Sequence, residues 1–170
     1  DTEISIILRS IMLLNSNSMD EIITNVPVFM QEYVCFDFMK LSKIKNYNDL
    51  LTVLSATPYK NVLKNFNAEN GNIDISGCEY ALKCFYYTNI LNSVDRNYKG
   101  TTRQELRKLI LIEAELINIS LIYRLKTYFK RSPSQIKNKL LPFYYKLNPS
   151  AINALLQTQS DKEFHKGIKL

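Results

Sequence analysis

Residues 101–130, TTRQELRKLILIEAELINISLIYRLKTYFK, are the stretch of sequence that decides the fold of this chain. It opens with Thr101-Thr102-Arg103-Gln104, a capping-box pattern in which a hydroxyl and an amide side chain bind the first free N–H groups of a helix. From Leu109 to Ile122 the residues are apolar on almost every helical face, and a helix of this kind must be surrounded by others. We therefore predict one helix of about 45 Å at the core of a helical bundle.

Helix start signals recur on both sides of this stretch. Ser18–Glu21, Ser132–Gln135 and Ser160–Glu163 are further capping boxes, and Asn46–Asp49 is a weaker relative. Pro133 occupies the favoured first position of its helix. The chain is therefore predicted to be all-α. The predicted helices cover residues 3–15, 19–26, 28–44, 47–56, 59–66, 74–93, 101–130, 133–141, 149–157 and 161–168.

Composition supports this fold class. The chain has 170 residues, 46% hydrophobic and 22% charged, close to an ordinary soluble protein. Four Gly and five Pro are too few for the many turns of a β-sandwich or barrel. Asn-rich residues 65–72 and residues 97–100 are the predicted breaks between helices.

Sequence features also recur at a nearly constant distance along the chain. The aligned pairs are Ser18–Glu21 with Ser132–Gln135 and Asn46–Asp49 with Ser160–Glu163, each 114 apart, and Ile4–Arg9 with Ile119–Arg124 and Pro27 with Pro142, each 115 apart. We interpret this as an internal duplication of about one and a half copies, because caps and Pro have positional meaning that composition does not fix. Residues 1–70 would be the C-terminal part of one repeat domain and residues 71–170 most of the next. Chance similarity between two amphipathic helical stretches is the alternative.

The net charge of +6 is unevenly distributed. Residues 1–85 contain seven Lys or Arg and ten Asp or Glu, whereas residues 86–170 contain fifteen and six. Such asymmetry favours a basic face toward an acidic partner, anionic lipid or nucleic acid. A merely solvated helix surface remains the alternative. No zinc-finger or RNA-binding motif accompanies the basic half, which makes nucleic acid the weaker interpretation.

Residues that could support chemistry are few. Cys35, Cys78 and Cys84 form no CxxC pair, and His165 is the single imidazole, so we predict no metal site and idle thiols. Glu113 and Glu115 lie 200° apart on a helix, too far around it for a paired acid and base, so a structural hydrogen bond or an Arg partner is expected for each. The sequence contains no phosphate-binding loop, HExxH or GxSxG. It therefore predicts no catalytic site and no cofactor.

No stretch of eighteen uncharged apolar residues is present, so no membrane span is predicted. The start, Asp1-Thr2-Glu3, has no basic region of the kind that opens a signal peptide. Because the missing half of the first repeat would lie before residue 1, we interpret the chain as a fragment of a longer protein.

A pattern of helix ends in the C-terminal part carries a family resemblance. It consists of an acid, an Asn, an Arg-x-Lys helix end and a capped helix that ends in a Leu-Pro step. The pattern resembles the C-subunit family of archaeal-type and bacterial V-type ATPases, whose counterpart in eukaryotic V-ATPases is the d-subunit. It is concentrated in residues 101–168 and weaker over 1–66, where Arg9 and Pro27 are kept but Glu3 stands in the place of the Asn. The residues that fill the pattern are Glu115, Asn118, Arg124, Lys126 and Pro142.

The resemblance implies a non-catalytic central-stalk subunit of a bacterial rotary ATPase that transports protons or sodium. Such a subunit has three similar helical domains and acts as a socket between the central-shaft subunits and the membrane rotor ring. It binds no nucleic acid, cofactor or small-molecule substrate. It would be cytoplasmic, peripheral on the inner face of the plasma membrane as part of the complex.

The resemblance and the charge pattern together give residue-level expectations. Arg9 and Arg124 are expected to clamp helix ends through carbonyls or a carboxylate such as Glu115 or Glu113. A basic interface for an acidic partner surface is expected at Lys130, Arg131, Lys137 and Lys139.

Three other interpretations remain open. The first is an unrelated helical adaptor that binds proteins in an apolar groove. The second is a basic nucleic-acid-binding helical domain. An enzyme is the most distant, because it would need a pocket that gathers Glu113 or Glu115 with His165 or a cysteine.

Overall fold

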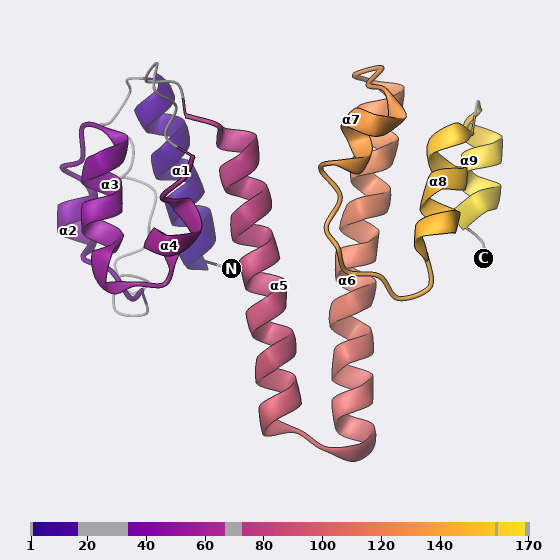
Figure 1. Cartoon of the computed structure of the whole chain (residues 1–170), viewed down its shortest axis with the longest axis horizontal. Coiled ribbons are helices and arrows are strands. Elements are labelled where there is room, and N and C mark those ends of the chain that lie inside the picture. Colours follow the sequence, from indigo (N-terminus) through magenta and orange to yellow (C-terminus); the bar gives the residue numbers. More distant parts are fainter. Residues whose placement is uncertain (1, 17–33, 67–72, 159, 169–170) are drawn as a thin grey trace. The chain divides into compact units, whose positions relative to one another are not determined.

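The structure, a computed structural model, describes residues 2–16, 34–66, 73–158 and 160–168. These residues form helices joined by turns and contain no β-strand, so the all-α prediction is confirmed (Figure 1). The elements are α1 (Thr2–Ser16), α2 (Phe38–Leu41), α3 (Tyr47–Val53), the short 3-10 helix η3 (Leu54–Ala56), α4 (Tyr59–Leu63), α5 (Ile75–Asn97), α6 (Gly100–Thr127), α7 (Pro133–Lys137), α8 (Pro149–Gln157) and α9 (Asp161–Ile168).

The chain divides into two compact units, Asp1–Tyr86 and Tyr87–Leu170, and the division falls within α5. The predicted boundary after residue 70 lies in a segment outside the described residues, so the two repeat domains stay a prediction. The internal duplication likewise stays a prediction.

The first unit is built around the apolar face of α1. Ile4, Ile7 and Ile11 are spaced three and four residues apart, so they lie on one face of the helix, and all three are buried. Leu50 of α3 and Leu63 of α4 are completely buried in the same core. Helix α1 owes its stability to the burial of this face, because an isolated helix of this length is only marginally stable in water.

The second unit is organised along α6. The chain leaves α7, returns alongside α6 through residues 138–148, and then reverses again into α8 (Figure 1). Ile122 of α6 and Ile136 of α7 share a buried core with Leu155 of α8 and Phe164 of α9. At the other end of α6, Asp95 of α5 forms ion pairs with Arg103 and Arg107.

Helix α6 confirms the long helix of the sequence prediction, with two differences. It begins at Gly100, which has a φ of +58°, and its N-cap Lys99 makes no side-chain capping bond, so the predicted box at Thr101–Gln104 is wrong. The helix is also not covered on every side in the described structure. The side chains of Leu109 and Leu116 are 62% and 57% exposed.

Several predicted helices are shorter than expected, among them α4, which ends at Leu63 instead of residue 66. In place of residues 28–44, the described part has only the single turn of α2, whose N-cap Asp37 accepts a hydrogen bond from the N–H of Lys40. Helix α7 has the predicted capping box at Ser132 and Gln135 but ends at Lys137 instead of residue 141. The predicted helix 19–26, the box at Ser18–Glu21 and Pro27 lie outside the described residues.

Candidate functional site

Three polar side chains of α6 lie on one stripe of the helix. Asn118 lies three residues after Glu115, and Lys126 lies eleven residues after Glu115. In a helix of 3.6 residues per turn, the three positions fall within about 80° around the helix axis. Glu115 and Asn118 are buried, although both are polar. Buried polar groups normally have hydrogen-bond partners. Glu115 and Asn118 find theirs in the segment that returns along α6, and Lys126 finds its partners at the end of α8.

Glu115 binds three consecutive backbone N–H groups. One carboxylate oxygen, Oε2, accepts hydrogen bonds from Tyr145, Lys146 and Leu147 at 2.9, 2.9 and 2.7 Å. These residues form no helix or strand, so their N–H groups have no regular secondary-structure partner. The carboxylate compensates for this, and charge-assisted bonds of this kind are about twice as strong as neutral ones.

Asn118 forms a two-way pair with the backbone of Leu141. Its amide Nδ2 donates to the carbonyl of Leu141, and its Oδ1 accepts from the N–H of Leu141, both at 2.8 Å. Asn118 is 1% exposed. The amide thus satisfies both backbone groups of one buried residue, which only a side chain with adjacent donor and acceptor can do.

Lys126 binds the C-terminal end of α8. Its ammonium Nζ lies 3.0 and 3.1 Å from the carbonyl oxygens of Leu155 and Leu156 and 2.6 Å from the hydroxyl of Thr158. A cation at this place also complements the negative end of the helix dipole. Burial lowers the pKa of Lys126 from its ordinary value, and the negative charge of Glu163 opposes that shift.

The other predicted motif residues lie elsewhere. Arg9 and Arg124 are exposed, and no hydrogen bond or ion pair joins either side chain to another described residue. Pro142 is exposed and follows Leu141 directly, at the point held by Asn118. The structure therefore sets Glu115 and Asn118 against the return segment and Lys126 against the end of α8, but it does not bring Arg124 to Glu115.

A similar device occurs in the first unit, where Glu3 of α1 binds two groups. Its carboxylate accepts a hydrogen bond from the N–H of Cys35 and one from the hydroxyl of Tyr59, both at 2.6 Å. Burial acts to raise the pKa of Glu3, but these two bonds outweigh it and lower the pKa below its ordinary value. Burial and the Glu3 carboxylate raise the pKa of the Cys35 thiol to about 11. This thiol is therefore protonated at neutral pH, as expected for an idle cysteine.

The lowered pKa of Glu3 predicts an acid-sensitive contribution to stability. A carboxyl whose folded pKa lies below its unfolded pKa stabilises above the unfolded value and loses that effect as pH falls through the folded one. Tyr59→Phe removes one of the two bonds and leaves the ring contact of Tyr59 with Phe85. We expect this variant to lose less stability than the wild type between about pH 6 and pH 3, by under about 1 kcal/mol because Glu3 is partly exposed.

Urea unfolding of both proteins at several pH values over this range measures the difference. Tyr98→Phe is the control, because Tyr98 lies in the second unit and its side chain is 45% exposed. Parallel pH profiles for the wild type and Tyr59→Phe would show that the bond from Tyr59 does not shift the titration of Glu3.

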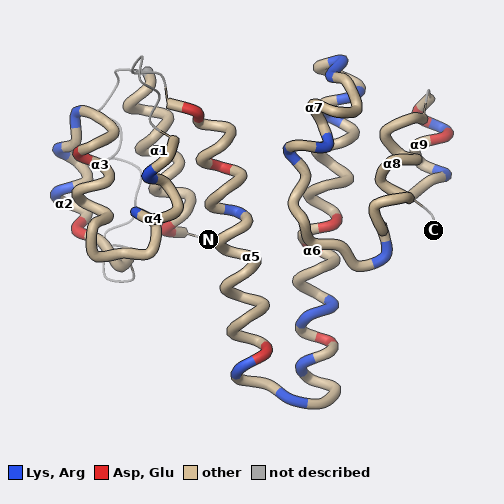
Figure 2. Tube along the Cα trace, viewed as in Figure 1, with Lys and Arg blue, Asp and Glu red and all other residues tan. Residues whose placement is uncertain are grey.

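The predicted basic residues are exposed around the junction of α6 and α7. Lys130, Arg131, Lys137 and Lys139 are all exposed, and none forms an ion pair with a described residue. They follow one another along the chain with no acidic residue between them, and Figure 2 shows several basic (blue) positions around α7. The aromatic side chains of Tyr128 and Phe129 immediately precede them and are 71% and 57% exposed.

The turn between α6 and α7 has a defined backbone. Lys130 has a φ of +49°, the left-handed region that favours glycine. The N–H of Arg131 donates to the carbonyl of Leu125 at 3.0 Å. A left-handed residue just past the end of a helix, with the next N–H bonded back to the last turn, ends α6, and Gly is the usual residue at such a left-handed position.

Lys130→Gly is therefore expected to stabilise the protein. Glycine adopts the left-handed region without the steric cost of a side chain, which is about 1 kcal/mol. Denaturant unfolding measures the change. Lys137→Gly, at the end of α7, is the matched control and should destabilise by about 0.5–1 kcal/mol, because a helical position disfavours Gly. Equal effects of the two substitutions would contradict a special backbone at Lys130.

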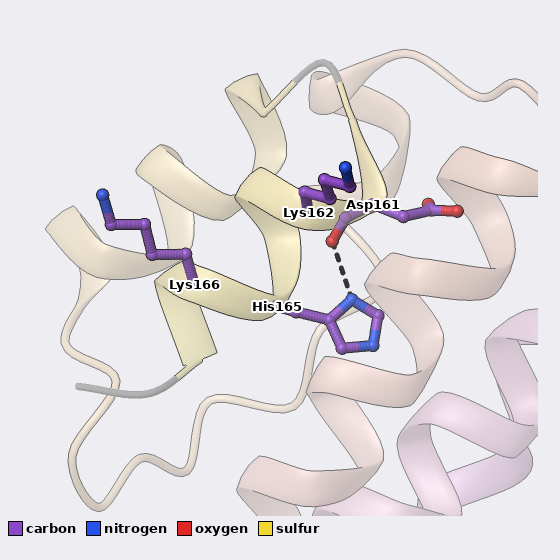
Figure 3. Close-up of a pocket in the computed structure, with 4 residues that line it drawn as sticks. All are labelled: Asp161, Lys162, His165 and Lys166. Carbon is purple, nitrogen blue, oxygen red and sulfur yellow. Dashed lines mark hydrogen bonds between the residues drawn. The ribbon is translucent and has the colours of Figure 1, made fainter.

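A hollow open to solvent lies on α9. It is lined by Asp161, Lys162, His165 and Lys166, and His165 Nδ1 lies 2.7 Å from the backbone oxygen of Asp161 (Figure 3). Neither Glu113 nor Glu115 lines this hollow, so it does not assemble the acid–histidine pocket that an enzyme interpretation needed. The part of the chain that the structure describes holds no cluster of three or more Cys, His, Asp or Glu arranged for a metal ion. Among the described helices, none has the length and apolar character to cross a bilayer.

Some contributing residues were missed in the sequence. Asn148 caps α8 by accepting a hydrogen bond from the N–H of Ala151 at 2.9 Å, and the sequence Asn-Pro-Ser at that point is a recognisable helix start. Thr158 completes the site of Lys126, and no local pattern indicates that role. The exposure of Tyr128 and Phe129 was missed because helix periodicity alone had extended the long helix past them.

Comparisons with known proteins agree with the pattern of helix ends. The family model of the ATP synthase (C/AC39) subunit matches residues 2–169. Over 88 residues the chain is 31% identical to the C-subunit of the A-type ATP synthase of Methanococcoides burtonii, a match that covers 52% of this chain and 23% of that relative. No solved structure matches the chain. Because the family model spans nearly all of its residues, the chain belongs to the ATP synthase (C/AC39) subunit family.

Proposed function

We propose that this chain is part of a non-catalytic central-stalk subunit of a rotary ATPase. In this role it would form part of a socket that couples the central shaft to the membrane rotor ring during ion transport. Family membership supports the kind of machine. The relative from Methanococcoides burtonii is itself named as a subunit of an ATP synthase.

The observation that carries the proposal is how α6 uses its polar stripe. Glu115, Asn118 and Lys126 bind backbone groups of residues between 141 and 156, and Lys126 also binds the hydroxyl of Thr158. Such bonds fix one part of the fold against another and provide no reacting group. A part that transmits torque must deform little, and a packed interior whose connecting segment is hydrogen-bonded along its length meets that need.

The exposed face of α6 is the proposed contact for the shaft. Leu109 and Leu116 are seven residues apart, so they lie on one face, and Glu113 between them is also exposed. Apolar residues with this spacing are typical of a helix that packs along another helix. The same observation also fits the second candidate, a helical adaptor with an unrelated partner. The identity of the partner distinguishes the two.

The test is co-expression of the full chain with the shaft and ring subunits of the rotary ATPase from the same organism. Light scattering after size-exclusion chromatography should detect a defined complex. Leu109→Ser with Leu116→Ser should weaken it by about tenfold or more, because apolar anchors dominate interfaces. Met39→Ser, at a residue of the first unit that is 62% exposed, is the matched control and should leave the complex intact.

Failure to form a complex with either the shaft or the ring subunits would overturn the proposal. If the variant with Leu109→Ser and Leu116→Ser formed the complex equally well, the exposed face of α6 would not be the contact, but the proposed stalk function would stand. A partner from outside the ATPase, bound through Leu109 and Leu116 alone, would favour the adaptor.

A further inference from the structure

We propose that the turn between α6 and α7 is a contact site for anionic lipid. This tip comprises Tyr128, Phe129, Lys130 and Arg131 together with Lys137 and Lys139. The inference rests on the proposed function, which locates the chain in a complex at a membrane, and it adds the lipid surface as a further partner.

Charge is the first argument. Residues 116–160 contain seven Lys or Arg and no Asp or Glu. Lys126 binds the end of α8, but the four cations of the tip have no acidic partner in the described part of the chain. Cations without an acidic partner in their own protein are available to bind an external anion. Each Lys or Arg near an anionic leaflet strengthens membrane binding about fivefold.

Exposed aromatic rings are the second argument. Tyr128 is 71% exposed and Phe129 is 57% exposed, although large apolar side chains are normally buried. The ring of Tyr123 holds Tyr128 edge-on at 6.2 Å between centroids, while most of the Tyr128 surface stays open. An aromatic pair beside Lys and Arg is the composition of segments that lie in the boundary between lipid headgroups and acyl chains.

The backbone of the tip is the third argument. The left-handed Lys130 and the hydrogen bond from Arg131 to Leu125 fix the end of α6, and the capping box of Ser132 and Gln135 fixes the start of α7. The backbone that carries the aromatic and basic residues of the turn is therefore fixed before any partner arrives, which reduces the entropy lost on binding.

A lipid surface fits these features better than an acidic protein does. Tyr128, Phe129, Lys130 and Arg131 lie in the turn that joins α6 to α7 (Figure 1), and all four are exposed. A protein partner would need a matching hollow for two rings, whereas headgroups rearrange around them. The tip also presents only cations, and a leaflet offers many anions at no fixed spacing.

The experiment is cosedimentation of the full chain with vesicles of phosphatidylcholine, with and without about one third phosphatidylglycerol. The chain should bind the anionic vesicles, and binding should weaken as salt rises. Neutralising the tip with Lys130→Gln, Arg131→Gln, Lys137→Gln and Lys139→Gln should weaken binding by more than about tenfold. The matched control neutralises four exposed cations of the first unit, Lys43, Lys45, Lys60 and Lys64, with the same residue.

The aromatic contribution is tested separately. Tyr128→Ser with Phe129→Ser should weaken vesicle binding by about tenfold while circular dichroism stays unchanged. Met12→Ser with Met39→Ser, at positions 49% and 62% exposed, is the control. Vesicle binding that both tip variants retain would overturn the inference.

A failure of the lipid site can be distinguished from a failure of the proposed stalk function. Each tip variant is also assayed in detergent for its complex with the shaft and ring subunits. Lost vesicle binding with an intact complex supports the lipid site. A lost detergent complex, with no vesicle binding by the wild type, would overturn the lipid site in favour of an acidic protein partner.

Discussion

Glu115→Ala is expected to destabilise the second unit by about 3–5 kcal/mol. The substitution leaves the backbone N–H groups of Tyr145, Lys146 and Leu147 without their acceptor, and that of Leu147 is buried. A buried donor without a partner costs about 1–3 kcal/mol. The two part-buried donors recover water bonds, which keeps the total below three times that figure.

Hydrogen exchange measured by mass spectrometry is the sharpest readout, because it reports on residues 145–147 directly. Their amides should exchange much faster in the variant, while those of α1 in the first unit stay unchanged. Denaturant unfolding gives the free energy. Glu113→Ala is the matched control, since Glu113 is exposed on the same helix and should change stability by under about 0.5 kcal/mol. Equal effects of the two substitutions would contradict the role of the three bonds.

Glu115→Gln separates charge from shape. The amide keeps an oxygen acceptor of similar size, but it loses the negative charge that strengthens all three bonds. The NH₂ group of the glutamine also places hydrogen-bond donors close to the three backbone N–H groups, which are donors themselves. We expect a loss between those of the wild type and the alanine variant, of about 1–3 kcal/mol.

The sequence indicated which polar residues of the long helix matter, but it did not indicate which residues they bind. The family pattern of helix ends singled out Glu115, Asn118 and Lys126 on residues 101–130. Their partners lie 23 to 32 residues further along the chain. Contacts of that separation depend on how the chain turns back after α7, and local helix signals do not contain this information.

A tertiary contact also explains why α7 is shorter than predicted. Leu140 and Leu141 are buried, and the backbone of Leu141 bonds to Asn118 on another helix. The segment after Lys137 therefore exchanges its helical bonds for bonds to α6. At its start, α6 is instead longer than predicted. Gly100 can adopt a positive φ, so the helix begins before the predicted threonine cap.

The two units use their leading helices in a comparable way. Glu3 binds the N–H of Cys35, and Glu115 binds the N–H of Leu147, each 32 residues ahead. Each bound segment is followed by a side-chain-capped helix, at Asp37 and at Asn148. These pairs lie 112 and 111 residues apart, whereas the predicted duplication has offsets of 114 and 115, so they do not support it and the duplication stays a prediction. An experimental structure that superposes residues 3–55 on 118–169 would test it.

Asn118→Asp is the second substitution with a large expected effect, about 3 kcal/mol or more at neutral pH. The side chain keeps its shape and still accepts from the N–H of Leu141, but it no longer donates to the carbonyl. A negative charge then faces a carbonyl oxygen in a place that is 1% exposed. Burial of a charge without a partner, added to the lost bond, makes this change more costly than its size suggests.

The sign of the pH dependence distinguishes this mechanism from simple loss of packing. Burial disfavours the charged aspartate and raises its folded pKa above the unfolded value, so the variant should regain stability as pH falls and the acid protonates. A protonated acid can again donate to the carbonyl of Leu141. Asn118→Leu is the control, because it removes both bonds and introduces no titrating group. Its difference from the wild type should not vary with pH. If Asn118→Asp and Asn118→Leu showed the same pH profile, the charge would not be the cause, and the two-way pair with Leu141 would matter only as packing.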